Sequence, residues 1–526
     1  MKRDSDGLAV RQRIIDIYSR TGFDGIDPAD LRGRFRWMGL YTQRAHGIPG
    51  GRTAVLEPEE LEDRFFMLRI RIDGGQLSPA QLRVIAGISI EFGRDVADVT
   101  DRQNIQLHWI RIEDVPEIWR RLESVGLSTT EACGDTPRVM LGCPLAGVTD
   151  DELIDATPYL DQVVSSYLGD PAFSNLPRKY KTSISGCSQH CTNHEINDVA
   201  FVGVRGRDGR VGFDLWVGGG LSTNPRLAER LNVFVAPERV AQVWAGVTAV
   251  YRDYGYRRSR THARLKFLLA DWGPEEFRRV LETEYLSSPL PDGPEPAPSS
   301  DADRDHVGAH RQNDGLFYVG FALRSGRTSG SQLGRIAELA LRYGDGRVRT
   351  TARQKLVILG VPQARVESLV AELAALDLPV RPSAFRRGTI ACTGLEFCKL
   401  AIVETKARAD WLYAELERRL PDFEESLSIN VNGCPNSCAR FQVADIGLKG
   451  IVVRGKDGSD AEGFQVHLGG HLGLQPALGR KFRGLKVPAD EAADYLERVL
   501  RGFQERGKPA ERFSAYVARA DEEWLR

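Results

Sequence analysis

Four cysteines in the last third of the chain constrain its structure more than any other feature. They form two close pairs, Cys392 with Cys398 in the spacing C-x5-C and Cys434 with Cys438 in the spacing C-x3-C. An iron–sulfur cluster can take its thiolates from loops far apart in sequence, provided that small, turn-forming residues bend the backbone around it. Such residues surround the second pair in the segment Asn-Gly-Cys-Pro-Asn-Ser-Cys. The spacing therefore favours an iron–sulfur site.

Two other interpretations of these cysteines stay open. A structural zinc site also uses four ligands, but its paired cysteines are usually separated by about two to four residues, which the first pair fits poorly. Unrelated buried cysteines are also common in enzymes of reducing compartments. The spacing alone does not exclude either.

The segments around the cysteines resemble the sirohaem-containing sulfite and nitrite reductases. They are Thr-Gly-Leu-Glu-Phe-Cys-Lys-Leu around Cys398 and Asn-Gly-Cys-Pro-Asn-Ser-Cys-Ala-Arg around Cys438. Further blocks match this family in order, over residues 67–75, 101–104, 137–139 and 176–182. The resemblance implies that the four cysteines hold a 4Fe-4S cluster and that Cys438 also reaches the iron of a sirohaem.

An internal repeat organises much of the chain. Apolar and polar residues alternate from Phe66 to Ile72, which indicates a strand, and a helix follows with Ser78 as N-cap and Pro79 at its first position. A strand over 104–110 and a helix over 115–125 complete the unit. Roughly 250 residues later the same order returns, over 316–323, 332–342, 354–359 and 365–376. The repeat predicts duplicated ferredoxin-like halves that form a pseudo-twofold core.

A proline-rich segment lies between the two copies. Its composition cannot bury a core and favours an extended tether, so we expect it to mark the boundary between them. Two further α/β lobes are expected after the copies, with the cofactors where the lobes meet, as the resemblance implies. The predicted fold class is α+β, on mixed sheets. The predicted units are an N-terminal extension (1–33), a first half (34–130), a sirohaem and substrate lobe (131–285), a linker (286–307), a second half (308–384) and a cluster and sirohaem lobe (385–526).

The resemblance also implies four cations on the substrate side of the sirohaem: Arg69, Arg138, Lys179 and Lys181. Arg69 lies on the polar side of its strand and can point into a cleft, although a solvated arginine is the alternative. Guanidinium and ammonium groups bind a small oxyanion, stabilise the charge that accumulates on it, and pass protons to departing oxygens. Because the cations are clustered around a buried haem, we expect lowered lysine pKa values.

Further residues are implied to lie at the cofactors. Arg102 and Gln103 match the block that pairs with the sirohaem carboxylates, and Asn436 is placed near the junction of cluster and haem. A strand-edge amide and a turn residue are the alternatives for Gln103 and Asn436. Segments 39–44 and 131–135 resemble the mycobacterial-type ferredoxin sulfite reductase, which implies a thioether crosslink between Tyr41 and Cys133. The alternative is a core tyrosine beside a buried thiol.

Three other cysteines have no role in the resemblance. Cys187 and Cys191 form another C-x3-C pair, with His190 and His194 close by. We interpret them as incidental thiols in a loop, with a zinc site or a redox bridge as the alternative. We interpret Cys143 as a small buried residue.

Composition narrows the functional class. The 526 residues are 42% hydrophobic and 27% charged, which is typical of a folded protein with several packed units, and the formal net charge of -1 argues against nucleic-acid binding. No signal-like segment or membrane-length apolar run occurs, so we expect a cytoplasmic protein. Because no nicotinamide- or flavin-binding motif occurs either, electrons must come from another protein. The resemblance implies ferredoxin, docking near the basic residues Arg440, Lys449, Arg480, Lys481 and Arg483.

Together these observations predict a ferredoxin-dependent assimilatory sulfite reductase, which carries out the six-electron reduction of sulfite to sulfide. Lys179-Tyr180-Lys181 resembles the sulfite reductase pattern, whereas plant-type nitrite reductases tend to carry asparagine in place of Lys181. A ferredoxin-dependent nitrite reductase, which forms ammonia, is the alternative. A non-catalytic iron–sulfur electron-transfer protein is the third possibility.

Overall fold

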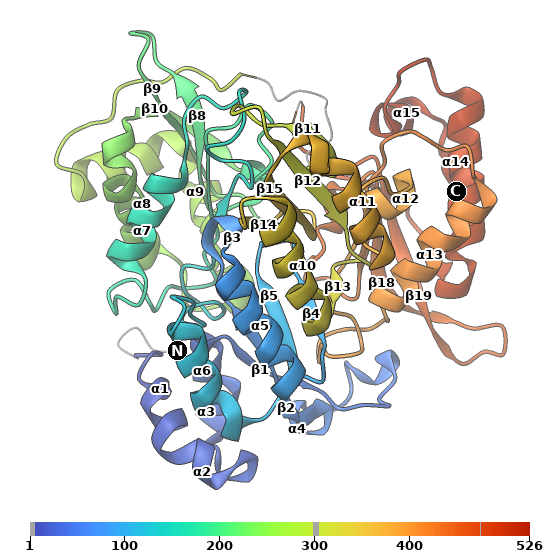
Figure 1. Cartoon of the computed structure of the whole chain (residues 1–526), viewed down its shortest axis with the longest axis horizontal. Helices are drawn as coiled ribbons and strands as arrows, with labels where there is room; N and C mark the ends of the chain where they lie inside the picture. The colour runs from blue at the N-terminus through green and yellow to red at the C-terminus, as the bar shows by residue number, and fades with distance from the viewer. Residues whose placement is uncertain (1–5, 298–304, 474) are drawn as a thin grey trace.

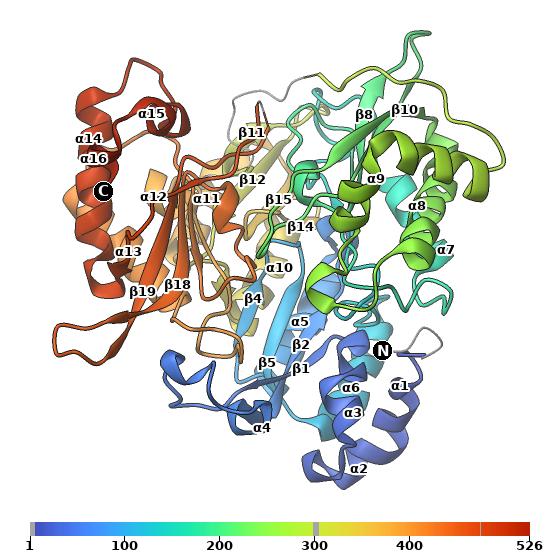
Figure 2. The same ribbon diagram turned by 180° about the vertical axis from the view of Figure 1, so that it is seen from behind.

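A computed structural model describes residues 6–297, 305–473 and 475–526. Two ferredoxin-like halves lie in the middle of the molecule, with the green N-terminal lobe (131–285) on one side and the orange to red C-terminal lobe (385–526) on the other (Figures 1 and 2). Residues 1–5 of the predicted extension and 298–304 of the predicted linker lie outside the described residues.

Each half contributes a strand to the sheet of the other half. The first sheet has the order β1-β2-β5-β4-β13, and the second has the order β11-β12-β15-β14-β3, so that β13 and β3 are exchanged. This reciprocal exchange fixes the two halves about a pseudo-twofold axis. The strands are β1 (Leu40–Arg44), β2 (Glu62–Ile70), β3 (Gln76–Leu77), β4 (Ala97–Val99), β5 (Ile105–Ile110), β11 (Gly308–Arg311), β12 (Phe317–Ala322), β13 (Arg327–Thr328), β14 (Val348–Thr350) and β15 (Lys355–Val361).

The first helices of the two copies pack against each other. Helix α5 (Pro79–Phe92) begins where Ser78 accepts a hydrogen bond from the Gln81 amide, and α10 (Gly330–Tyr343) begins in the same way at Ser329. Helices α6 (Val115–Glu123) and α11 (Val366–Ala375) complete the two copies, whose buried side chains form one continuous core. The predicted strand–helix–strand–helix repeat is confirmed.

The two lobes share one sheet topology. Their strand orders are β6-β7-β8-β9-β10 and β16-β17-β18-β19-β20. In each lobe the first two pairings along the chain are parallel and the later ones are antiparallel. The strands are β6 (Leu141–Gly142), β7 (Thr182–Ser185), β8 (Val199–Arg205), β9 (Val211–Val217), β10 (Glu229–Val235), β16 (Thr389–Ala391), β17 (Ile429–Asn432), β18 (Ile446–Arg454), β19 (Asp460–Leu468), β20 (Arg480–Lys481) and β21 (Val487–Pro488). The predicted α+β class on mixed sheets is confirmed.

Helices cover each lobe and give it a core of its own. The N-terminal lobe carries α7 (Thr157–Tyr167), α8 (Val240–Tyr254) and α9 (Leu265–Val280), and the C-terminal lobe carries α12 (Ala384–Gly388), α13 (Lys406–Arg419), α14 (Ala492–Arg506), α15 (Phe513–Arg519) and α16 (Glu522–Leu525). The short helices α1 (Val10–Arg13), α2 (Ser19–Thr21), α3 (Pro28–Arg32) and α4 (Pro58–Leu61) flank the first half. Among the described helices, none combines the length and apolar character needed to cross a bilayer.

The described part of the linker is hydrogen-bonded to the N-terminal lobe. The Phe234 amide donates to the carbonyl of Pro291, and Arg230 donates to the carbonyl of Pro294, both at 2.8 Å. Residues 286–297 therefore lie along β10, because their carbonyls satisfy donors at that sheet edge.

Candidate active site

The four paired cysteines meet in the C-terminal lobe. Cys392 directly follows β16, and Cys434 and Cys438 follow the neighbouring strand β17. Burial, together with the nearby sulfurs of Cys438 and Cys398, raises the pKa of Cys392 to about 12. The Gly433 amide donates to the Cys392 sulfur at 3.2 Å. Two loops at one end of adjacent strands thus bring four sulfurs around a common space.

The spacing of these sulfurs suits a cluster better than one ion. A tetrahedral zinc site holds its sulfurs about 3.8 Å apart. Within the described residues, no three of these four sulfurs lie within 4.8 Å of one another. A cube of iron and sulfide spreads its thiolates more widely. Cys438 is the exposed member of the four, so its sulfur also faces the space outside the loop.

A group of cations lies within electrostatic range of this loop. Burial, Arg264 and Arg138 lower the pKa of Lys179 to about 8, while the Cys438 thiolate opposes them. Burial also lowers the pKa of Lys181 well below its usual value, with further lowering by Arg102 and Lys179. Neither ammonium group has a hydrogen bond or ion pair with a described residue. The electrostatic interaction of Lys179 with Cys438 joins the cation group to the cysteine loop.

The two predicted arginines adjoin this group. Arg69 and Arg138 both lower the pKa values of the same two neighbours, Tyr41 and Arg102. The Nε of Arg69 is buried without a partner in the described chain, whereas that of Arg138 donates to the Gly134 carbonyl at 2.8 Å. A buried guanidinium nitrogen without a partner, as in Arg69, favours an anion beside it. A sirohaem with its many carboxylates, and a small oxyanion on it, fit these residues.

Arg102 and Gln103 are placed differently from each other. Arg102 donates to Asn197 at 2.7 Å and to the Val139 carbonyl at 2.6 Å, and burial lowers its pKa to about 10. The Gln103 amide donates to the carbonyls of Gly142 and Thr350 at 3.0 and 2.8 Å. Both amide hydrogens are therefore used, and Gln103 has none left for a sirohaem carboxylate. It joins the first half to the N-terminal lobe and to the second half.

Asn436 and the Tyr41–Cys133 pair complete the predicted set. Asn436 is exposed at the tip of the second cysteine loop, and its backbone amide donates to the Cys434 sulfur. Tyr41 lies beside Cys133: burial raises the pKa of Tyr41, and the Cys133 thiolate raises it further. The Arg36 guanidinium lies 5.8 Å from the centre of the Tyr41 ring. The structure thus places the tyrosine, the cysteine and Arg138 together.

The sequence did not predict the positions of two arginines. Arg264 was not singled out, yet it pairs with Asp198 at 2.7 Å and adds to the positive field at Lys179. No local pattern marks it, because its position depends on the fold of the lobe. Arg440, predicted to face a docking partner, is instead buried and binds Asp101 and the Ala352 carbonyl at 3.2 and 2.6 Å. It joins the C-terminal lobe to both halves.

Comparison with known proteins places this geometry in a family. The chain matches the family described as "Nitrite and sulphite reductase 4Fe-4S domain" over residues 133–290 and 383–526. It also matches the "Nitrite/Sulfite reductase ferredoxin-like half domain" over 59–125 and 309–376. The chain belongs to the nitrite and sulphite reductase family. The predicted family is confirmed, and with it a sirohaem and a 4Fe-4S cluster as the cofactors.

Relatives within the family match along the whole chain. A protein of Mycobacterium tuberculosis (strain H37Rv) named sulfite reductase (ferredoxin) is 55% identical and covers 100% of this chain and 95% of its own. The solved structure of the Mycobacterium tuberculosis NirA protein has a TM-score of 0.97 and 55% identity, and covers 100% and 96% of the two chains. An assimilatory ferredoxin-dependent nitrite reductase of Haloferax mediterranei is 38% identical over 98% and 90%.

Proposed function

We propose that this protein is a ferredoxin-dependent assimilatory sulfite reductase that reduces sulfite to sulfide. The observation that carries the proposal is the electrostatic interaction of Lys179 with Cys438, because it indicates that the cation group lies near a thiolate of the cluster loop. The relatives named sulfite reductase share more sequence with this chain than the nitrite reductase does, 55% against 38% identity.

The proposed division of labour follows from the two sides of the site. When bound, the sirohaem and the cluster supply electrons to the sulfur of the substrate; Cys392, Cys398, Cys434 and Cys438 would hold the cluster, and Arg102 would pair with a sirohaem carboxylate. Arg69 and Arg138 bind the oxyanion through their guanidinium groups. Sulfite carries up to two negative charges, so two arginines and two lysines match it better than they match nitrite.

Protons are assigned to the lysines. A pKa of about 8 lets Lys179 hold a proton at Nζ near neutral pH and still release it to a departing oxygen. Burial, Arg102 and Lys179 also lower the pKa of Lys181, so its Nζ is a second group from which a proton can pass to the anion. Each oxygen that leaves as water consumes protons, so two adjacent donors suit this reaction.

Ferredoxin is the proposed electron donor, and the cytoplasm, a reducing compartment, is the proposed location. With Arg440 buried, the basic residues that remain proposed for docking are the half-buried Lys449 of β18 and the exposed Arg480, Lys481 and Arg483 on and after β20. A surface pair with carboxylates of a ferredoxin would weaken as salt is added.

The test is steady-state turnover of the anaerobically purified protein with reduced ferredoxin. We expect sulfide from sulfite with a kcat/KM higher than that for nitrite. A higher kcat/KM for nitrite would favour the nitrite reductase alternative, which the Haloferax relative supports. Absence of turnover with both anions, in a protein that contains the cluster, would contradict both.

A further inference from the structure

A second cysteine loop occupies the same position in the N-terminal lobe as the cluster loop in the C-terminal lobe. Gly142 pairs with Ile184 between β6 and β7, and Ala391 pairs with Val431 between β16 and β17. A cysteine follows directly after Gly142 and after Ala391, and another stands three residues after Ile184 and after Val431. Cys143 and Cys187 are therefore the counterparts of Cys392 and Cys434.

The equivalence extends past these residues. The third cysteine of each loop comes four residues later, Cys191 in one lobe and Cys438 in the other. A 3-10 helix follows each at the same distance, His194–Ile196 and Phe441–Val443. The residue before each helix is left-handed, Asn193 with φ 53 and Arg440 with φ 57. Even the glutamines correspond, since Gln103 binds Gly142 and Gln354 binds Ala391.

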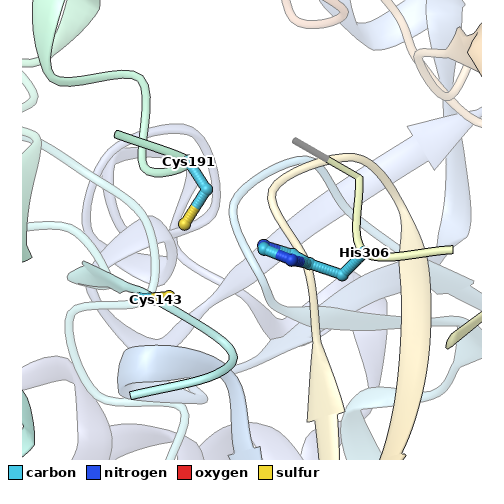
Figure 3. A group of neighbouring side chains, drawn as sticks. All are labelled: Cys143, Cys191 and His306. Atoms are coloured by element: carbon cyan, nitrogen blue, oxygen red, sulfur yellow. The ribbon is translucent and has the colours of Figure 1, made fainter. Parts of the chain in front are cut away.

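The fourth ligand is where the two loops differ. Cys398 has no cysteine counterpart, but the ring of His306 reaches the N-terminal loop from the segment that precedes β11. Figure 3 shows the Cys191 sulfur and the His306 ring pointing toward one another, with Cys143 beside them. One ligand atom from each of these three residues lies within 4.8 Å of the others. The Nε2 of His306, a residue only 7% exposed, has no partner among the described residues.

Cys187 completes the group. Its thiol shares hydrogen bonds with the thiols of Cys143 and Cys191, and its sulfur accepts from the Gln189 amide at 3.3 Å. Apolar side chains enclose the site, among them Val357 and Leu359 of β15. Three sulfurs and an imidazole therefore lie together in an apolar enclosure, and burying an imidazole nitrogen without a partner is costly.

We propose that Cys143, Cys187, Cys191 and His306 bind one zinc ion. The Cys3His set is a common structural zinc set, and the C-x3-C spacing falls within its usual range. The compact approach of three ligands also suits a single tetrahedral ion, whereas the cluster cysteines of the C-terminal lobe stand farther apart. This assignment replaces the interpretation of these cysteines as incidental thiols.

Such an ion would tie the N-terminal lobe to the second half. The cysteines belong to loops after β6 and β7, while His306 stands two residues before β11. The same β7–β8 loop carries Asn197, which holds Arg102 at 2.7 Å. The zinc would therefore fix a loop that positions a residue of the cofactor site, without itself touching substrate.

The test is the metal content of the full-length holoenzyme, purified anaerobically from zinc-supplied cells. We expect about one zinc per chain in addition to iron, with the zinc K-edge spectrum showing three sulfur ligands at about 2.3 Å and one nitrogen at about 2.0 Å. His306→Gln and Cys191→Ser should lower zinc to about a tenth or less while iron and the sirohaem spectrum are retained. The matched control is His310→Gln, which makes the same change at an exposed histidine on β11.

Three results would overturn the proposal. The first is wild-type protein that neither contains zinc nor takes it up after reduction. The second is a zinc content that is unchanged in His306→Gln. The third is a site that is occupied by iron or closed by a Cys187–Cys191 disulfide. The spectrum of the wild-type protein decides the case even if a variant fails to fold. Because zinc is measured separately from iron and turnover, failure here leaves the proposed sulfite reduction intact.

Discussion

In the N-terminal lobe the residue before β7 is Lys181, and in the C-terminal lobe the residue before β17 is Ser428. Both backbone amides donate to an aspartate that stands just before the next strand, Asp198 at 2.8 Å and Asp445 at 2.9 Å. Around this shared frame the side chains diverge. Asp198 pairs with Arg264, whereas the Ser428 hydroxyl donates to Asp445.

The cysteine loops of the lobes diverge in the same manner. The C-terminal loop keeps four spread thiolates and leaves Cys438 exposed. In the N-terminal loop the thiols of Cys143 and Cys191 and the imidazole of His306 form a compact, buried group, with the Cys187 thiol hydrogen-bonded beside them. In the proposed assignment, one duplicated scaffold provides the cluster ligands from one copy and most of the anion-binding cations from the other. The comparison teaches that catalysis here depends on the difference between the copies.

The sharpest way to break this comparison is to remove the equivalent first cysteine of each loop. Cys392→Ser should lose the cluster and lower sulfite turnover below about 1% of wild type, since the cluster lacks a ligand. Cys143→Ser, its counterpart, should keep iron and the sirohaem absorption but lose zinc. Metal analysis and turnover measure both. Equal loss of iron from the two variants would show that the loops are not distinct sites.

The next largest effect concerns the cations that only the N-terminal lobe carries. Lys179→Met and Lys181→Met should each lower kcat by about 10²- to 10⁴-fold, because a proton donor is lost. Since Lys179 is protonated below its pKa of about 8, wild-type kcat/KM should fall as pH rises through 8, and this decline should be absent in Lys179→Met. Exposed Lys456→Met is the control. An unchanged pH profile in Lys179→Met would assign the proton to another group.

The repeated glutamines give a smaller effect, on stability. Gln103→Ala and Gln354→Ala each leave buried backbone groups unpaired, at a cost of about 1–3 kcal/mol. The loss should be greater for Gln103, which also binds Thr350 of the other half. Calorimetry at one scan rate should therefore show a lower Tm for both, lower for Gln103→Ala. An unchanged Tm with loss of sirohaem in Gln103→Ala would instead show that Gln103 contributes to cofactor binding.

The smallest expected effect concerns the predicted crosslink. A Tyr41–Cys133 thioether should appear as one joined peptide whose mass is lower by two hydrogen atoms. Cys133→Ser should reduce kcat by less than about tenfold, since neither residue is assigned to proton donation. Peptide mapping of active enzyme measures the bond. Separate peptides of unmodified mass would remove it.

Much of this fold could be predicted from local sequence. Strand alternation around Leu68, the Ser78 cap and the returning order of elements located the duplicated halves, because periodicity and capping act over a few residues. The predicted linker is the exception, since its contacts with β10 depend on an edge formed elsewhere in the chain. The strand exchange of β3 and β13 is equally invisible to local patterns.

The candidate site likewise contains residues that local sequence predicts and residues that it does not. The cluster cysteines could be predicted because a cofactor imposes spacing on the sequence that binds it. Arg264, the burial of Arg440 and the approach of His306 to Cys191 could not, since each joins segments far apart in the chain. Gln103 shows the converse, because its sequence match implied a cofactor contact while its amide binds backbone on both sides.

The most direct test of the central claim is a crystal structure of the anaerobically purified enzyme with sulfite bound. We predict that the Cys438 sulfur lies between the cluster and the sirohaem iron, and that the oxygens of the anion contact Arg69, Arg138, Lys179 and Lys181. An anion held by residues of the C-terminal lobe, or a cluster bound without Cys438, would contradict the account.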